Sequence, residues 1–137
     1  MTTSLSVEWV PVDRIADAWP AAENALRRGL AYHPGVTLDD MRADVMSGVA
    51  QLWTIDARCW CVVKLLHYAT RTVLLVYGMA GSEIQGWRRT LTGALDAYAI
   101  EVGADSIRCF AHHRLALVLG RAGWEHRAHV MERTPDG

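Results

Sequence analysis

The feature that most constrains the fold of this chain is a series of three apolar runs between residues 49 and 77. Each run has the length of an ordinary β-strand, and the three are Val49–Ile55, Cys59–Tyr68 and Thr72–Tyr77. Only the short segments 56–58 and 69–71 separate them, which are lengths typical of hairpin turns. The pattern therefore predicts an antiparallel meander, followed by a loop over the glycine-bearing residues 78–82.

One long amphipathic helix comes next. Its apolar residues recur at helical spacing, and they are Trp87, Leu91, Ala94, Leu95, Tyr98, Ala99 and Val102. Gly103 suits the end of this helix, and Ser106–Ala111 has the pattern of a further strand. A helix that links two strands of one sheet makes a right-handed crossover, in which the two strands are parallel. We therefore expect the strand that ends near Tyr77 to run parallel to the strand that begins near Ser106.

Shorter elements are predicted before the meander and after the strand Ser106–Ala111. They are a strand Ser4–Val10, a helix Ile15–Leu30 that Pro20 must kink or divide, a short helix Leu115–Leu119 and a last strand Trp124–Met131. Thr37 and Asp40 form a capping box for another helix, which runs to about Ser47 and ends at Gly48. The prediction is a single α/β domain with a mixed sheet over residues 1–137, of order β-α-α-β-β-β-α-β-α-β, with a frayed tail from about residue 134.

The composition is that of a globular protein, with 51% hydrophobic and 21% charged residues. No apolar run approaches the roughly 20 residues that a membrane-spanning helix needs, and the first residues lack the pattern of a secretory signal. The expected location is therefore the cytoplasm. The formal net charge is −1 and the charges are scattered, which argues against binding to duplex nucleic acid. Lys64 is the only lysine, which indicates the codon bias of a GC-rich genome.

The C-terminal half carries more specific detail. From Val73 to Met131 it has a strand, a glycine-bearing loop, a long helix ending in Ala99-x-x-x-Gly103, a strand, a short helix and the pair Gly123-Trp124. In this order and these details the chain resembles the GNAT superfamily of N-acetyltransferases. It also looks like the small GNAT-like proteins of tailed bacteriophages, which share its "GRAGW" ending. A phage or prophage origin, in a host cytoplasm or in a virion, is therefore expected.

The resemblance implies a site for acetyl-coenzyme A at the start of the long helix. In the family, backbone N–H groups of a Q/R-x-x-G-x-G/A loop hold the pyrophosphate there, as unpaired donors at a helix N-terminus do for other anions. The implied cofactor contacts are Gly78, Gly86, Trp87 and Arg88. Two positions depart from the family pattern, because Glu83 replaces Gln or Arg and Arg88 replaces the second glycine. The expected site is therefore degraded, with weak or lost binding of acetyl-coenzyme A.

The same resemblance leaves few groups for proton transfer. Leu119 stands where many members have a tyrosine that protonates the leaving thiolate, and His112 where an asparagine often opens the segment. The candidates for a catalytic base near the end of the fourth strand are Tyr77 and His67.

The three cysteines form no disulfide pattern, since their number is odd. Cys59, Cys61 and Cys109 are expected to be reduced and at least partly buried. A nucleophilic Cys–His pair would require Cys109 or Cys61 to meet His67 or His112 in space. No metal site is expected.

Two functions are compatible with these features. The first is acyl transfer from acetyl-coenzyme A to an amine, on a small molecule or a host protein. The alternative is a non-catalytic scaffold that acts as a phage virion component or as a binding module for a phage or host protein. Gly86 and the order of elements favour the first, whereas Glu83, Arg88 and Leu119 favour the second.

Overall fold

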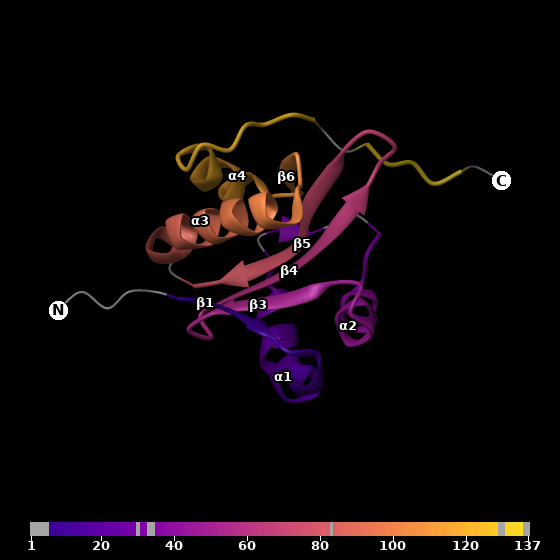
Figure 1. Ribbon diagram of the computed structural model, residues 1–137, viewed down its shortest axis with the longest axis vertical. Helices are drawn as coiled ribbons and strands as arrows, with labels where there is room; N and C mark the ends of the chain where they lie inside the picture. The colour runs from indigo at the N-terminus through magenta and orange to yellow at the C-terminus, as the bar shows by residue number, and fades with distance from the viewer. Residues whose placement is uncertain (1–5, 30, 33–34, 83, 129–130, 136–137) are drawn as a thin grey trace.

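A mixed β-sheet forms the middle layer of the molecule, and helices cover both of its faces (Figure 1). The structure is a computed structural model that describes residues 6–29, 31–32, 35–82, 84–128 and 131–135. The strands are β1 (Val7–Val10), β2 (Ala31–Tyr32), β3 (Gln51–Ile55), β4 (Cys59–His67), β5 (Thr72–Gly81) and β6 (Ser106–Cys109). The helices are the 3₁₀ turn η1 (Val12–Arg14), α1 (Ile15–Leu26), α2 (Leu38–Ser47), α3 (Ile84–Val102) and α4 (His113–Gly120).

The strand order across the sheet is β1-β3-β4-β5-β2, and β6 also pairs with β5. Strands β3, β4 and β5 form the predicted antiparallel meander, with β1 antiparallel to β3. β5 and β6 run parallel, from Val73 opposite Ser106 to Val76 opposite Cys109. The predicted crossover through α3 is therefore confirmed, as is the mixed α/β fold class.

A β-bulge interrupts β5 at Tyr77. Val62 of β4 lies opposite Gly78 and Val63 lies opposite Val76, so Tyr77 is an extra residue with no opposite partner on β4. A bulge re-aims the side chains around it. The Tyr77 side chain packs into the layer that contains α1 and α2.

Each face of the sheet has its own hydrophobic core. The core under α3 and α4 includes Trp53, Met79, Trp87, Leu91, Leu95 and Leu115. The core under α1 and α2 includes Ile15, Trp19, Leu52, Trp60, Leu75 and Tyr77. Trp53, Trp60 and Trp87 are thus core residues. Within the described part of the chain, each helix falls short of the length or the apolar character that a membrane span requires.

The predicted ends of α2 are confirmed in detail. The Thr37 hydroxyl accepts a hydrogen bond from the backbone N–H of Asp40 at 3.1 Å, and the Asp40 carboxylate accepts one from the backbone N–H of Thr37 at 2.9 Å. These bonds hold the pKa of Asp40 below its usual value, because they stabilise the charged carboxylate. Gly48 ends the helix with φ of 82°, in the left-handed region that glycine enters without strain.

The prediction of a last strand over Trp124–Met131 is wrong for the residues that the structure describes. Residues 124–128 and 131 belong to no strand and pair with no neighbour in a ladder. After the half-buried Trp124, residues 125–128 are all exposed. With successive residues on both sides of the segment exposed, no face of it docks on the core.

The boundaries of β5 and α1 also differ from the prediction. Residues 78–81, predicted as a loop, continue β5 opposite Cys59–Val62. Gly81 serves a close approach of two strands, because a Cβ there would lie 2.6 Å from the carbonyl oxygen of Arg58. α1 continues through Pro20 as one helix and ends at Leu26.

Candidate functional site

The end of β5 and the start of α3 form the region where the sequence places a coenzyme. β5 ends at Gly81 and α3 begins at Ile84. The outer edge of β5, on the side away from β4, has two different neighbours along its length. β6 pairs in parallel with it up to Val76, and beyond the bulge β2 pairs with it antiparallel, with Tyr32 opposite Gly78 and Ala31 opposite Met79.

The first turn of α3 combines open and buried positions. Gly86 is exposed, and a Cβ placed there would meet nothing within 4 Å. Trp87 is buried, and its indole N–H donates a 2.7 Å hydrogen bond to the backbone oxygen of Ser82. Arg88 is half-buried, whereas Arg89 is exposed. Glu83, the predicted carboxylate of this site, lies outside the described residues.

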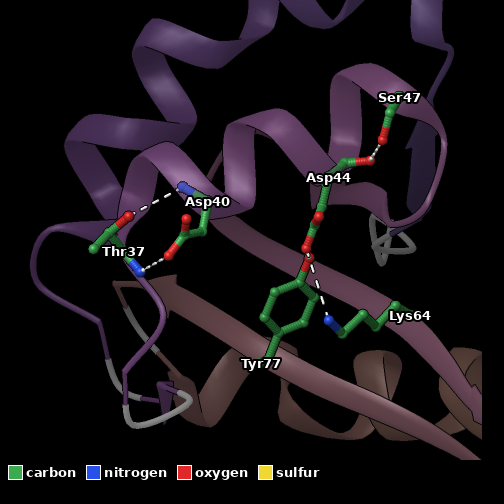
Figure 2. A network of polar contacts seen from close by, with 6 residues as sticks. All are labelled: Thr37, Asp40, Asp44, Ser47, Lys64 and Tyr77. Carbon is green, nitrogen blue, oxygen red and sulfur yellow. Dashed lines mark hydrogen bonds and ion pairs between the residues drawn. The ribbon is translucent and has the colours of Figure 1, made fainter.

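A polar network connects β4, β5 and α2 beside the bulge (Figure 2). The Tyr77 hydroxyl donates a 2.7 Å hydrogen bond to the carboxylate of Asp44 on α2. The Lys64 ammonium on β4 lies 3.7 Å from the same carboxylate oxygen and 4.6 Å from the centroid of the Tyr77 ring. Lys64 therefore makes an ion pair and a cation–π contact at once.

This network determines what Tyr77 can do chemically. Burial raises the pKa of Tyr77 well above its usual value, and the hydrogen bond to the Asp44 carboxylate raises it further. The phenol is therefore protonated at neutral pH, and its proton points to Asp44. A phenol in this state cannot accept a proton from a substrate amine.

The other candidates for proton transfer lie apart from Tyr77. His67 is exposed at the end of β4, where its Nδ1 lies 3.4 Å from the Thr72 hydroxyl. Its strand neighbours Val63 and Leu65 pack toward α3, on the opposite face of the sheet from Tyr77. The structure therefore does not bring the two predicted base candidates together. Leu119 is buried in the core under α4, and His112 is exposed just before that helix.

The cysteines are free thiols, as predicted, with Cys59 and Cys61 buried and Cys109 half-buried. The contact with Cys59 raises the pKa of Cys61 and burial raises it further, while burial raises the pKa of Cys109 to about 12. A thiol that stays protonated is a poor nucleophile. In the described part of the chain, His, Cys, Asp and Glu side chains do not gather in threes around a point that could hold a metal ion.

Sequence reasoning missed Asp44 and Lys64 as partners. A signal was present, because Lys64 interrupts an otherwise apolar strand and shares its face with Trp60 and Val62. A cation at such a position requires an acceptor on the element packed above it. The position of Asp44 on α2 depends on the packing of that helix and could not be read from spacing.

The same fold occurs in solved acetyltransferase structures. No family model matches the sequence, and no curated protein matches it. One similar structure is glucosamine-6-phosphate N-acetyltransferase from Arabidopsis thaliana, with a TM-score of 0.65 and 10% identity, covering 98% of this chain and 100% of that one. Another is an aminoglycoside N-acetyltransferase in complex with CoA, with a TM-score of 0.66 and 13% identity, covering 98% and 97%.

A third similar structure is a predicted acetyltransferase with acetyl-CoA from Clostridium acetobutylicum. Its TM-score is 0.64 at 12% identity, and the match covers 96% of each chain. At such identities the likeness establishes the fold and not the chemistry. The chain therefore has the fold of these acetyltransferases, which is the fold that its resemblance to the GNAT superfamily implies.

Proposed function

We propose that this chain is a GNAT-fold acetyltransferase-like protein whose acetyl-coenzyme A site is degraded, so that it binds the coenzyme weakly and transfers acetyl groups slowly or not at all. The observation that carries the proposal is the pairing of β2 with β5 at Gly78 and Met79. The stretch from Gly78 to Gly81 joins the start of α3 to the bulge at Tyr77. A coenzyme with its phosphates at α3 and its acyl group near Tyr77 has to pass along this stretch.

The residues present fit such a coenzyme only at the phosphate end. Gly86 leaves the first turn of α3 open to solvent, and α3 is long enough to present a full set of N-terminal donors. Arg88 adds a positive charge in the same turn. The backbone of Gly78, in contrast, is paired with that of Tyr32 in β2, and Trp87 is buried in the core. The acyl arm of the coenzyme therefore lacks the backbone edge that it would need.

Proton transfer is also poorly supported around the bulge. The Tyr77 hydroxyl donates its hydrogen bond to Asp44, and the aliphatic side chain of Leu119 has no proton to give to a leaving thiolate. General acid–base catalysis contributes about 10²- to 10⁴-fold to the rate of such reactions. If the protein is an active enzyme, Tyr77 and Leu119 do not supply this rate enhancement.

A non-catalytic binding module is the second candidate. A groove of about 1310 Å³ follows β6 between α3, α4 and residues 122–128. Among the described residues β6 pairs only with β5, so its other edge has no strand partner there. Such an edge can accept an extended segment of a phage or host protein. The phage or prophage origin, and with it a role in the virion, stays a prediction from the sequence.

Calorimetric titration with acetyl-coenzyme A tests the proposal. We expect no micromolar site in the native protein and no release of coenzyme A thiol in the presence of small amines. Replacing both Ala31 and Tyr32 by proline removes the backbone donors of β2. This change should strengthen coenzyme binding by uncovering β5, and Glu83→Gln should strengthen it by removing negative charge.

Ala69→Pro, in the exposed turn between β4 and β5, is the matched control and should leave binding unchanged. Micromolar binding by the native protein, displaced by free coenzyme A, would contradict the degraded site. Equal affinities of the native and β2 variants would contradict the role assigned to β2.

A further inference from the structure

A second cavity lies at the opposite end of the sheet from the start of α3. Its volume is about 350 Å³, and it opens between the end of β4, the last turns of α3 and the segment that connects α2 to β3. Val63, Leu65 and Leu74 line its apolar part, while Gln51, His67 and Tyr98 are polar residues of its lining (we call it the Tyr98 pocket). Lys64 also lines the pocket, and its ammonium is paired with Asp44 on α2.

A directed chain of hydrogen bonds ends at this pocket. The indole N–H of Trp53 can only donate, and it donates to Gln51 Oε1 at 2.9 Å. This contact orients the Gln51 amide, so that its Nε2 donates to the Tyr98 hydroxyl oxygen at 2.8 Å. Because the hydroxyl oxygen is the acceptor in that bond, the hydroxyl hydrogen of Tyr98 is left to donate elsewhere.

The position of Tyr98 is held firmly. Its ring packs edge-on against the buried Trp53, with 5.4 Å between the ring centroids and 80° between the planes. Both the ring and the hydroxyl are therefore placed before any ligand arrives. A donor placed in advance costs little ordering entropy when it binds.

His67 supplies a second polar group at the mouth of the pocket. Its Nδ1 faces the Thr72 hydroxyl, so that Nε2 is the nitrogen directed away from that contact. In the tautomer in which Nδ1 accepts a hydrogen bond from the Thr72 hydroxyl, Nε2 carries the ring hydrogen and can donate. Among the described residues that line the pocket there is no Asp or Glu.

We propose that the Tyr98 pocket binds a small carboxylic acid with a short aliphatic body. Its two donors, Tyr98 and His67, suit the two oxygens of a carboxylate, and the hydrogen bonds become stronger when the acceptor is charged. The wall formed by Val63, Leu65 and Leu74 suits a branched chain of a few carbons. The Tyr98 pocket is separate from the coenzyme region, so the result of testing one proposal does not decide the other.

Titration of the native protein with isovalerate, followed by ¹⁵N NMR of the tryptophan indole signals, tests this proposal. The Trp53 signal, assigned with a Trp53→Phe variant, should shift and saturate, because ligand binding at Tyr98 acts on the chain of hydrogen bonds that begins at Trp53. Tyr98→Phe removes one donor to a charged acceptor and should weaken binding about tenfold. His67→Ala, at an exposed position that does not endanger folding, should also weaken binding.

Tyr68→Phe is the matched control, since Tyr68 is an exposed tyrosine whose hydroxyl accepts a hydrogen bond from Arg108 outside the pocket. It should leave the isovalerate affinity unchanged. The neutral amide isovaleramide should bind more weakly than isovalerate. Equal affinity for the amide would overturn the carboxylate class. A Trp53 signal that does not saturate, or isovalerate affinities of Tyr98→Phe and His67→Ala equal to that of the native protein, would overturn the site.

Discussion

The carboxylate of Asp44 organises the polar side chains beside the bulge. It accepts a hydrogen bond from the Tyr77 hydroxyl and forms an ion pair with Lys64, and about 30% of its own side-chain surface remains exposed. Ion pairs with this degree of exposure contribute little to stability, in the range of about 0–1 kcal/mol. The bond to Tyr77 matters more, because the Tyr77 side chain is buried and its hydroxyl would otherwise lose a partner. The chemistry that Tyr77 offers is thus set by its burial and by its hydrogen bond to Asp44.

The raised pKa of Tyr77 makes stability depend on pH in the alkaline range. Above the ordinary tyrosine pKa of 10.0, the unfolded chain loses the phenol proton while the folded protein keeps it. The unfolded state then binds fewer protons, so the free energy of unfolding falls as pH rises, by at most about 1.4 kcal/mol per pH unit. Tyr77→Phe should remove this dependence, at a cost of about 1 kcal/mol near neutral pH.

Urea unfolding at a series of pH values measures both effects. Tyr68→Phe, at an exposed tyrosine, is the control and should follow the native protein throughout. The thiols of Cys61 and Cys109 contribute to the alkaline slope in every variant, so the difference between Tyr77→Phe and native protein isolates the phenol. Identical slopes in these two proteins would contradict the assigned state of Tyr77.

At the scale of single elements, β5 combines a bulge with two glycines that serve close packing. Gly78 faces α1 and α2, where a Cβ would meet the sulfur of Met41 at 3.0 Å. Gly81 faces the turn before β4, where a Cβ would lie 2.6 Å from a backbone oxygen and 2.9 Å from the Cα of Cys59. The two glycines in residues 78–82 indicated a loop, because glycine is common in loops. The same residues in fact allow neighbouring chains to approach β5 closely.

Gly81→Ala should therefore destabilise the protein strongly, since backbone atoms cannot move aside as a flexible side chain can. We expect a loss of at least about 2 kcal/mol, as for other changes that overpack a core. Gly93→Ala is the matched control, because Gly93 is exposed in the middle of α3 and a Cβ there meets nothing within 4 Å. It should stabilise α3 by about 0.5–1 kcal/mol. Chemical denaturation measures both, and a Gly81→Ala variant as stable as the native protein would argue against the close pairing of β4 with β5.

At the scale of the whole molecule, the sheet separates two layers with different roles. The layer of α1 and α2 contains the Asp44 network and continues into β2, which covers the outer edge of β5. The layer of α3 and α4, on the other face of the sheet (Figure 1), borders the Tyr98 pocket and the groove along β6. The segment after α4 crosses this second layer, and Trp124 attaches it through an indole hydrogen bond to Thr92 at 3.2 Å.

Truncation after Glu125 tests the structure of that last segment. Residues 126–128 and 131–135 are exposed and form no ladder, so their removal should change the free energy of unfolding by less than about 0.5 kcal/mol. Trp124→Ala should instead cost about 2–3 kcal/mol, because Trp124 packs against the core and bonds to Thr92. A truncated protein that lost several kcal/mol would indicate that the segment forms the strand predicted from the sequence.

Much of the fold followed from local patterns in the sequence. The meander, the parallel β5 and β6, the inward face of α3 and the capping box of α2 all depend on periodicity or on contacts between near neighbours. The prediction of the last strand was wrong because an alternating pattern indicates a strand only when one face is apolar. The strand also needs a free edge of the sheet with which to pair. The loop predicted over residues 78–82 failed because glycine has the same signature in a turn and at a close contact.

The candidate sites followed from the sequence only in part. Periodicity placed Tyr77 on a strand and Tyr98 on the inner face of a helix, because both facts depend on residues a few positions away. Their hydrogen-bond partners, Asp44 and Gln51, are 33 and 47 residues away along the chain. Which side chains meet across such distances depends on how α2 and α3 dock on the sheet. The sequence by itself therefore determined the elements and their buried faces, and only the tertiary structure decided that Tyr77 keeps its proton, that β2 covers β5 and that Tyr98 has a donor to offer.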